Sequence, residues 1–169
     1  GVIWVGSTGG ISLFDGKKFT PFLLPDAKVE NPKPMLSDKL VFKFVEDRNG
    51  TMWLATDGNG IFKYKNGEFI HLTSKNGLTD NNVADILEDK QGNIWIGTKG
   101  GTLNKFSPIS EKFEQIKLSE NKFNENSITS ILEDNAGTIW VGTYSQGLFQ
   151  YQPATGKINS WKYDPNNRS

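Results

Sequence analysis

The sequence predicts an all-β fold, a β-propeller made of four-stranded antiparallel blades. The main observation is a repeat: Gly1–Ser7, Gly50–Thr56, Gly92–Thr98 and Gly137–Thr143 share one pattern around a central tryptophan. Trp4, Trp53, Trp95 and Trp140 recur at intervals of 49, 42 and 45 residues. A period in the forties with four strands per unit is typical of propeller blades. The composition agrees, because aromatic residues (12%) favour strands and 18 glycines permit many tight turns.

Each unit is expected to hold four short strands, A to D in chain order. Strand B carries the tryptophan, and the other strands follow from runs of β-branched and aromatic residues. We place strand A at Val41–Val45, Val83–Leu87 and Ile128–Leu132, strand C at Ile61–Tyr64 and Leu148–Tyr151, and strand D at Phe69–Leu72. The dipeptide Asn66-Gly67 predicts a two-residue hairpin turn between strands C and D.

An acidic turn joins strands A and B in three units, as in Glu88-Asp89-Lys90-Gln91-Gly92. Neighbouring residues at a strand end point to opposite faces, so Glu88 and Asp89 do not form a catalytic pair. We expect the aspartate to accept backbone N–H bonds in its own turn and the glycine to adopt positive φ. These structural positions are Asp47, Asp89, Asp134, Gly50, Gly92 and Gly137, together with the four repeated tryptophans. We expect Trp53, Trp95 and Trp140 to be buried at equivalent positions between blades.

The chain therefore reads as one propeller fragment over residues 1–169. Its blade units are expected at about 1–23, 38–74, 81–119 and 126–163, with a Pro-rich insert at 24–37 that contains Pro25, Pro32 and Pro34. The first unit lacks strand A, so about four blades are present and the propeller is partial. We expect another copy of the chain, or the remaining blades of a longer one, to cover its flanks.

Charge and composition exclude several functions. Lys+Arg and Asp+Glu both number 19, and this balance argues against a nucleic-acid partner. No apolar run is long enough to span a bilayer, so we expect no membrane contact by this segment. With no cysteine and with His71 as the single histidine, on predicted strand D, we expect no metal site, no cofactor and no catalytic residue. Calcium held by oxygen ligands in a loop such as Asp57-Gly58-Asn59 stays an open alternative.

The B–C loops and the D–A connections should emerge on one face, because strand direction alternates. These segments differ most between units, and loops on a rigid scaffold are common binding sites. The candidate ligand-binding residues are Asp57, Asn59, Lys99, Tyr144, Ser145, Gln146, Asn81 and Asn82. Lys75, Asn76 and Asp80 lie on the same predicted face.

The segment from Glu88 to Gly101, with Gly92-Asn93-Ile94-Trp95-Ile96-Gly97-Thr98 at its centre, resembles the two-component regulator propeller repeat. The resemblance covers nearly all the chain outside about Leu23–Ser37. It implies a seven-bladed propeller in the periplasmic sensor domain of a membrane-anchored hybrid histidine kinase. It also implies an oligosaccharide ligand, since members with known ligands sense breakdown products of complex carbohydrates. Ala55 and Ser145-Gln146 depart from the glycines of the pattern.

Three functions follow as hypotheses. The first is a non-enzymatic binding module that recognises a glycan-derived ligand and passes a signal onward. The second is a lyase or glycoside hydrolase acting at the propeller axis, which needs an acid or base present in one blade only. The third is a scaffold that binds another protein through the same face.

Overall fold

The structure, a computed structural model, describes residues 2–7, 10–22, 41–119 and 127–162. The predicted Pro-rich insert at 24–37 lies outside these residues. Within the described part the fold is all-β, with one short 3-10 helix, η1 (Ser74–Asn76). No helix in these ranges has the length and apolar character that crossing a bilayer requires.

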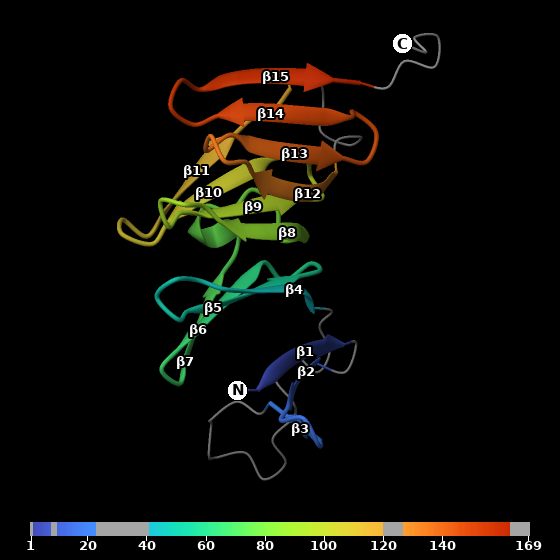
Figure 1. Cartoon of the computed structure of the whole chain (residues 1–169), viewed down its shortest axis with the longest axis vertical. Coiled ribbons are helices and arrows are strands. Elements are labelled where there is room, and N and C mark those ends of the chain that lie inside the picture. Colours follow the sequence, from blue (N-terminus) through green and yellow to red (C-terminus); the bar gives the residue numbers. More distant parts are fainter. Residues whose placement is uncertain (1, 8–9, 23–40, 120–126, 163–169) are drawn as a thin grey trace.

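The described strands form four antiparallel sheets that follow one another along the long axis of the molecule (Figure 1). The first sheet has three strands, β1 (Ile3–Ser7), β2 (Gly10–Phe14) and β3 (Phe19–Pro21). The second has β4 (Val41–Glu46), β5 (Met52–Thr56), β6 (Ile61–Lys65) and β7 (Glu68–Leu72). The third has β8 (Val83–Glu88), β9 (Ile94–Thr98), β10 (Leu103–Ser107) and β11 (Lys112–Ile116). The fourth has β12 (Ile128–Glu133), β13 (Ile139–Thr143), β14 (Leu148–Gln152) and β15 (Lys157–Trp161).

Every sheet has its strands side by side in chain order, which is the blade topology. β4, β8 and β12 lie at the inner edge, where the sheets approach each other, and β7, β11 and β15 lie at the outer edge. The first unit begins at its second strand. The predicted partial propeller with one three-stranded blade is therefore confirmed.

The strand boundaries differ slightly from the sequence expectation. Each inner strand runs one residue further and ends on the glutamate of the acidic turn, Glu46, Glu88 or Glu133. The Asn66-Gly67 turn has the predicted hairpin geometry, with φ of 52° and 90° at the two residues. Each inner strand also has an irregular register near its start, for example between Val83 and Asp85, which the sequence did not indicate.

The core is divided among the three spaces between neighbouring sheets. In the space between the second and third sheets, Trp53, Ile61 and Leu72 pack against Ile86 and Phe106. The backbone of Gly97 also lies close against side chains of the next sheet, so that a Cβ at this position would be 2.4 Å from Ile128 Cγ2. A side chain at Gly97 would therefore push two blades apart, which explains the glycine in this repeat.

The repeated tryptophans are not equally covered. Trp53 and Trp95 are buried, whereas Trp140 and Trp4 are partly buried. Burial of Trp140 was expected, and the structure corrects this. The indole of Trp140 lies in the last sheet, where no further described sheet covers it, and it stacks on Trp161 of its own sheet.

Candidate ligand-binding face

Alternating strand direction gives each blade two ends. We call one end the loop face; it contains the B–C loops at 57–60, 99–102 and 144–147 and the connection at 73–82. We call the opposite end the turn face; it contains the A–B turns at 47–51, 89–93 and 134–138 and the C–D turns. The candidate ligand-binding residues lie on the loop face, and the repeated acidic residues lie on the turn face.

The B–C loops share one backbone scaffold. The hydroxyl of the last strand residue donates to a carbonyl four residues on, from Thr56 to Gly60 at 2.7 Å and from Thr143 to Gly147 at 2.8 Å. Gly60 and Gly147 adopt positive φ, and a Cβ on either would meet backbone of the adjacent outer strand within 2.3 Å. The loops are thus rigid at their bases, and their tips carry the residues that differ between units.

One ion pair joins the loops of the second and third sheets. Lys99 Nζ donates to Asp57 Oδ1 at 2.9 Å, and both side chains are partly exposed. Asn59 Nδ2 donates to the Asp57 carbonyl at 3.1 Å. Exposed pairs of this kind are worth only about 0–1 kcal/mol to stability, so their groups can exchange partners at little cost.

The connection before the third sheet is tied to these loops. Asp80 accepts from the Asn82 amide through Oδ1 and from the Gly100 amide through Oδ2, each at 2.9 Å. The backbone carbonyls of Asn81 and Asn82 accept from Gly60 and Lys99, both at 2.8 Å. The structure therefore brings Asn81 and Asn82 next to Asp57, Asn59 and Lys99. The backbone groups of Asn81 and Asn82 are already hydrogen-bonded within these loops.

The fourth unit contributes the third loop. Tyr144 is 84% exposed, and its amide donates to the Ser127 carbonyl at 2.8 Å. The Gln146 amide donates to Thr143 Oγ1 at 3.1 Å, while Ser145 lies exposed at the tip. The loop at 144–147 belongs to the sheet that follows the one with Lys99, and none of the contacts described above links it to the loop at 99–102.

His71 adjoins the loop face, which the sequence alone did not reveal. Its ring stacks on Phe62 with centroids 4.1 Å apart, and its Nε2 lies 2.6 Å from the Asn59 carbonyl oxygen. The residue is on the outer strand β7, at the edge of the sheet opposite the inner strand β4. The His71 ring contacts the loop that contains Asn59, and its place on an outer strand is unsuited to acid–base chemistry at the propeller axis.

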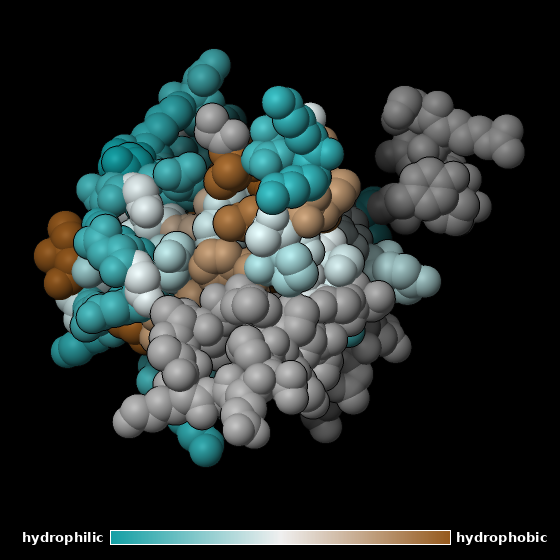
Figure 2. Space-filling model, turned by 90° about the horizontal axis from the view of Figure 1, so that it is seen from below, coloured by the Kyte–Doolittle hydropathy of each residue, from teal (hydrophilic) through white to brown (hydrophobic). Residues whose placement is uncertain are grey.

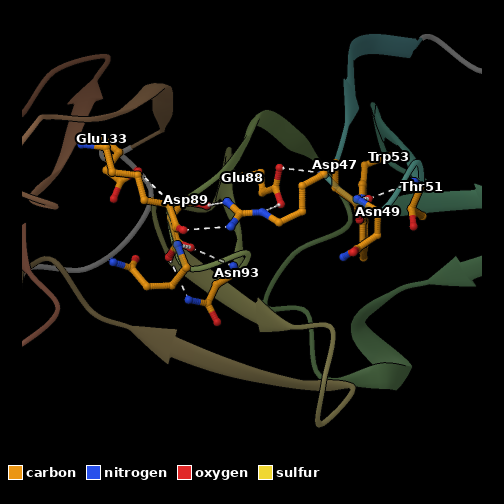
Figure 3. Close-up of polar contacts among 11 residues, drawn as sticks. Asp47, Asn49, Thr51, Trp53, Glu88, Asp89, Asn93 and Glu133 are labelled. Carbon is orange, nitrogen blue, oxygen red and sulfur yellow. Dashed lines mark hydrogen bonds and ion pairs between the residues drawn. The ribbon is translucent and has the colours of Figure 1, made fainter.

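The turn face is built from repeated hydrogen bonds (Figure 3). Asp47 Oδ1 accepts from the amides of Asn49 and Thr51, both at 2.9 Å, and its Oδ2 accepts from the Trp53 indole at 2.9 Å. The third and fourth units repeat this arrangement, with indole bonds of 2.8 Å to Asp89 and Asp134. Gly50, Gly92 and Gly137 close these turns with positive φ.

These bonds affect the acidity of the turn aspartates. Burial acts to raise the pKa of Asp47, but the bonds from Trp53, Thr51 and Asn49 outweigh it and the pKa lies below its ordinary value. For Asp134 the bond from the Trp140 indole is the largest cause, and it also lowers the pKa. A carboxylate held ionised by three donors is a structural acceptor and a poor proton donor.

The glutamates of the acidic turns face a different way from the aspartates. Glu88 accepts from the Arg48 amide through Oε2 at 3.0 Å and from Arg48 Nε through Oε1 at 2.6 Å. Arg48 belongs to the turn of the preceding sheet, so this contact joins two blades. The carboxylates of Glu88 and Asp89 thus have separate partners.

A cavity of about 370 Å³ also lies at the turn face, between the second sheet and the C–D turn of the third. Its walls include Lys63, Glu68, Ile70 and Pro108. Lys63 Nζ is engaged by Glu111 at 2.8 Å. Among the described residues, no group of three or more His, Asp or Glu side chains could hold a metal ion here or elsewhere.

Comparison with known proteins identifies the repeat. The family described as two component regulator propeller matches residues 35–58, 77–100 and 122–145. No curated protein has a sequence that matches the chain.

Solved structures share the fold. One is the extracellular domain of a putative hybrid two-component system from B. thetaiotaomicron, with a TM-score of 0.74 and 21% identity over 96% of this chain and 23% of that one. A second such domain from the same organism has a TM-score of 0.72 and 20% identity over 94% of this chain and 21% of that one. A catalytically inactive histidine-to-alanine variant of virginiamycin B lyase from Staphylococcus aureus, solved with quinupristin, has a TM-score of 0.66 and 15% identity, covering 98% and 60%. The chain thus spans about a quarter of the length of the two-component domains.

Proposed function

Because the chain carries three two-component regulator propeller repeats, we propose that it is part of the periplasmic sensor domain of a hybrid two-component signalling protein and binds a glycan-derived ligand. The repeat match is the observation that carries this proposal. The likeness to two extracellular domains of such systems supports it. In this role the chain is a binding module without catalysis of its own.

The loop face is the proposed binding surface. A sugar ring presents hydroxyls, which need paired donors and acceptors, and an apolar side, which packs on an aromatic ring. Lys99 and Asp57 offer a cation and a carboxylate 2.9 Å apart, and hydrogen bonds to charged groups are among the stronger ones. Tyr144 offers an exposed aromatic ring in the next blade. On the turn face, by contrast, the repeated aspartates already accept hydrogen bonds from their own turns and from the tryptophan indoles.

An enzymatic role is the second candidate, and the likeness to virginiamycin B lyase favours it. That lyase is inactive as a histidine-to-alanine variant. The single histidine of this chain, His71, lies on an outer strand and touches a backbone carbonyl. This placement weighs against a lyase site built from His71.

A thermal-shift screen of the full chain against oligosaccharides of different charge and linkage tests the proposal. We expect at least one oligosaccharide to raise the unfolding temperature, and Tyr144→Ala to remove the effect. Lys65→Ala, on the turn face, is the matched control and should keep it. If no oligosaccharide binds, but a protein partner raises the unfolding temperature and Tyr144→Ala removes that effect, the face is a protein scaffold. Conversion of quinupristin by the chain would instead establish a lyase.

A further inference from the structure

Lys63 is a largely enclosed cation between the second and third sheets. It lies on β6 opposite the buried Trp53, and its side chain is only 16% exposed. Its Nζ lies 5.8 Å from the centroid of the Phe106 ring. Its carboxylate partner is Glu111, whose Oε1 accepts from Nζ at 2.8 Å. Because an enclosed ammonium without a counter-ion is costly, Lys63 requires an anion at this point.

The counter-ion of Lys63 comes from another blade. Lys105 is the equivalent residue of the third sheet, and it lies opposite Glu114 of its own sheet. The residue opposite Lys63 is Ile70, so Lys63 takes its carboxylate from the C–D turn of the third sheet. The Glu111 side chain is 67% exposed. This carboxylate can therefore leave for water at little cost, whereas the enclosed ammonium cannot.

Glu111 has a backbone conformation that favours glycine. Its φ is 53°, and the equivalent residue in the fourth unit is Gly156, with φ of 71°. The two turns are otherwise alike. The Glu111 amide donates to the carbonyl four residues before it at 2.8 Å, and the Gly156 amide makes the same bond at 2.8 Å. A glutamate at positive φ is strained, and residues with such strain are concentrated at functional sites.

The Lys63–Glu111 pair lies beside two cavities. The cavity of about 370 Å³ at the turn face and a second one of about 270 Å³ both have Lys63 and Ile70 in their walls. Glu111 is part of the wall of the second cavity. The other residues that line this second cavity are mainly apolar: Leu72, Phe106 and Phe113, with Asn76 of η1. The ion pair is thus the only charged group in a mainly apolar wall.

This wall defines the class of ligand that fits. Ile70 is 44% exposed and Ile109, in the turn that contains Glu111, is 97% exposed. Figure 2 shows apolar residues in brown at the surface among polar ones in teal. Apolar side chains beside one enclosed cation suit a ligand with an apolar body and one negative charge. The present partner of that cation is a carboxylate, so a carboxylate is the charged group that we expect.

We propose that the cavity beside Lys63 binds a small organic acid with an apolar body, and that Glu111 occupies the position of its carboxylate until the acid displaces it. Glu111 leaves readily because its side chain already lies largely in water. The glutamate is thus an internal competitor that sets the affinity for the acid. The site lies between two blades, and the inference is independent of what the loop face binds.

The test uses phenylacetate as the probe. Phenylacetamide, which has nearly the same shape without the charge, is the matched control ligand. Binding is followed in the full chain by NMR of labelled isoleucine methyl groups, because Ile70 lines both cavities. Ile158, which is partly buried in the fourth sheet, is the internal reference for an intact fold. We expect phenylacetate to shift the Ile70 resonance until the site is saturated and phenylacetamide to leave it in place.

Three variants separate the roles of the two charges. Glu111→Gly removes the competing carboxylate, so the Kd for phenylacetate should fall about fivefold, the factor that an exposed ion pair commonly contributes. Lys63→Met keeps an unbranched side chain without the charge and should abolish the shift of Ile70 while the Ile158 resonance stays in place. Lys105→Met is the matched control and should leave the Kd unchanged.

Three results would overturn the proposal. One is an Ile70 resonance that phenylacetate does not move even in the Glu111→Gly variant. Another is an equal shift with phenylacetate and phenylacetamide. The third is binding that survives Lys63→Met. Tyr144→Ala should bind phenylacetate as the unchanged chain does, so a failure of this site is distinguishable from a failure of the loop-face proposal.

Discussion

Lys90 and Arg48 occupy equivalent positions but complete their interfaces differently. Arg48 donates from Nε to Glu88 Oε1 at 2.6 Å and from its two terminal nitrogens to the carbonyls of Lys90 and Asp89. Lys90 has one terminal nitrogen, which is bound to the Asp134 carbonyl. As a result Glu133 Oε1 is buried without a hydrogen-bond partner. We therefore predict that Lys90→Arg stabilises the protein.

The magnitude follows from the missing bond. A hydrogen bond between charged groups contributes about 1.5–3 kcal/mol when well enclosed. Lys90 is exposed, and surface ion pairs contribute about 0–1 kcal/mol, so we expect a gain of about 1 kcal/mol in the free energy of unfolding. For a chain of this size the unfolding temperature should rise by about 2–4 °C. The reciprocal change, Arg48→Lys, should lower stability by about the same amount, because it removes the hydrogen bond from Arg48 Nε to Glu88.

Urea denaturation followed by tryptophan fluorescence measures both variants against the unchanged chain. Opposite shifts of the midpoint with an unchanged denaturant slope are the expected result. If Lys90→Arg lowers the midpoint, or leaves it unchanged while Arg48→Lys lowers it, the unpaired Glu133 oxygen is not the weak point that we infer.

The remaining predictions concern the repeated residues. Trp95→Ala should cost about 3–5 kcal/mol of unfolding free energy, as truncations of large buried aromatics do, and an unchanged denaturation midpoint would contradict its place between blades. Asp89→Ala should cost roughly 1–3 kcal/mol through unsatisfied turn donors while ligand affinity stays the same; full stability with lost binding would make this carboxylate functional. Because the pKa values of Asp47 and Asp134 are lowered in the folded state, their contribution is present above the ordinary aspartate pKa of about 3.9 and is lost as pH falls through the folded values. Acid titration of stability should therefore be shallower for Asp134→Asn than for the unchanged chain, and equal slopes would refute this.

Much of the fold could be predicted because the repeat is local. The tryptophan strand, the acidic turn and the Asn66-Gly67 hairpin each lie within a few residues, so their spacing is visible in the sequence. The contacts between blades could not be predicted in the same way. Arg48 and Glu88 are 40 residues apart, and only the stacking of sheets brings them together.

The candidate site shows the same limit. Divergence between repeats pointed to Asp57, Lys99 and Tyr144, but the Asp57–Lys99 bond depends on packing between two blades. The sequence named Asn82 as a candidate ligand-binding residue but could not show that its amide donates to Asp80, two residues before it. The burial predicted for Trp140 was wrong because burial of the repeated tryptophan depends on a neighbouring sheet, and no further described sheet packs against the fourth.

The central claim is that repeated residues hold the blades together and divergent loops on the opposite face bind the ligand. Hydrogen exchange of the chain with and without an oligosaccharide that raises its unfolding temperature tests this directly. We predict slower exchange at 57–60, 99–102 and 144–147 and little change at the turns 47–51, 89–93 and 134–138. Protection confined to the turns and to the cavity beside Lys63 and Ile70 would contradict the claim.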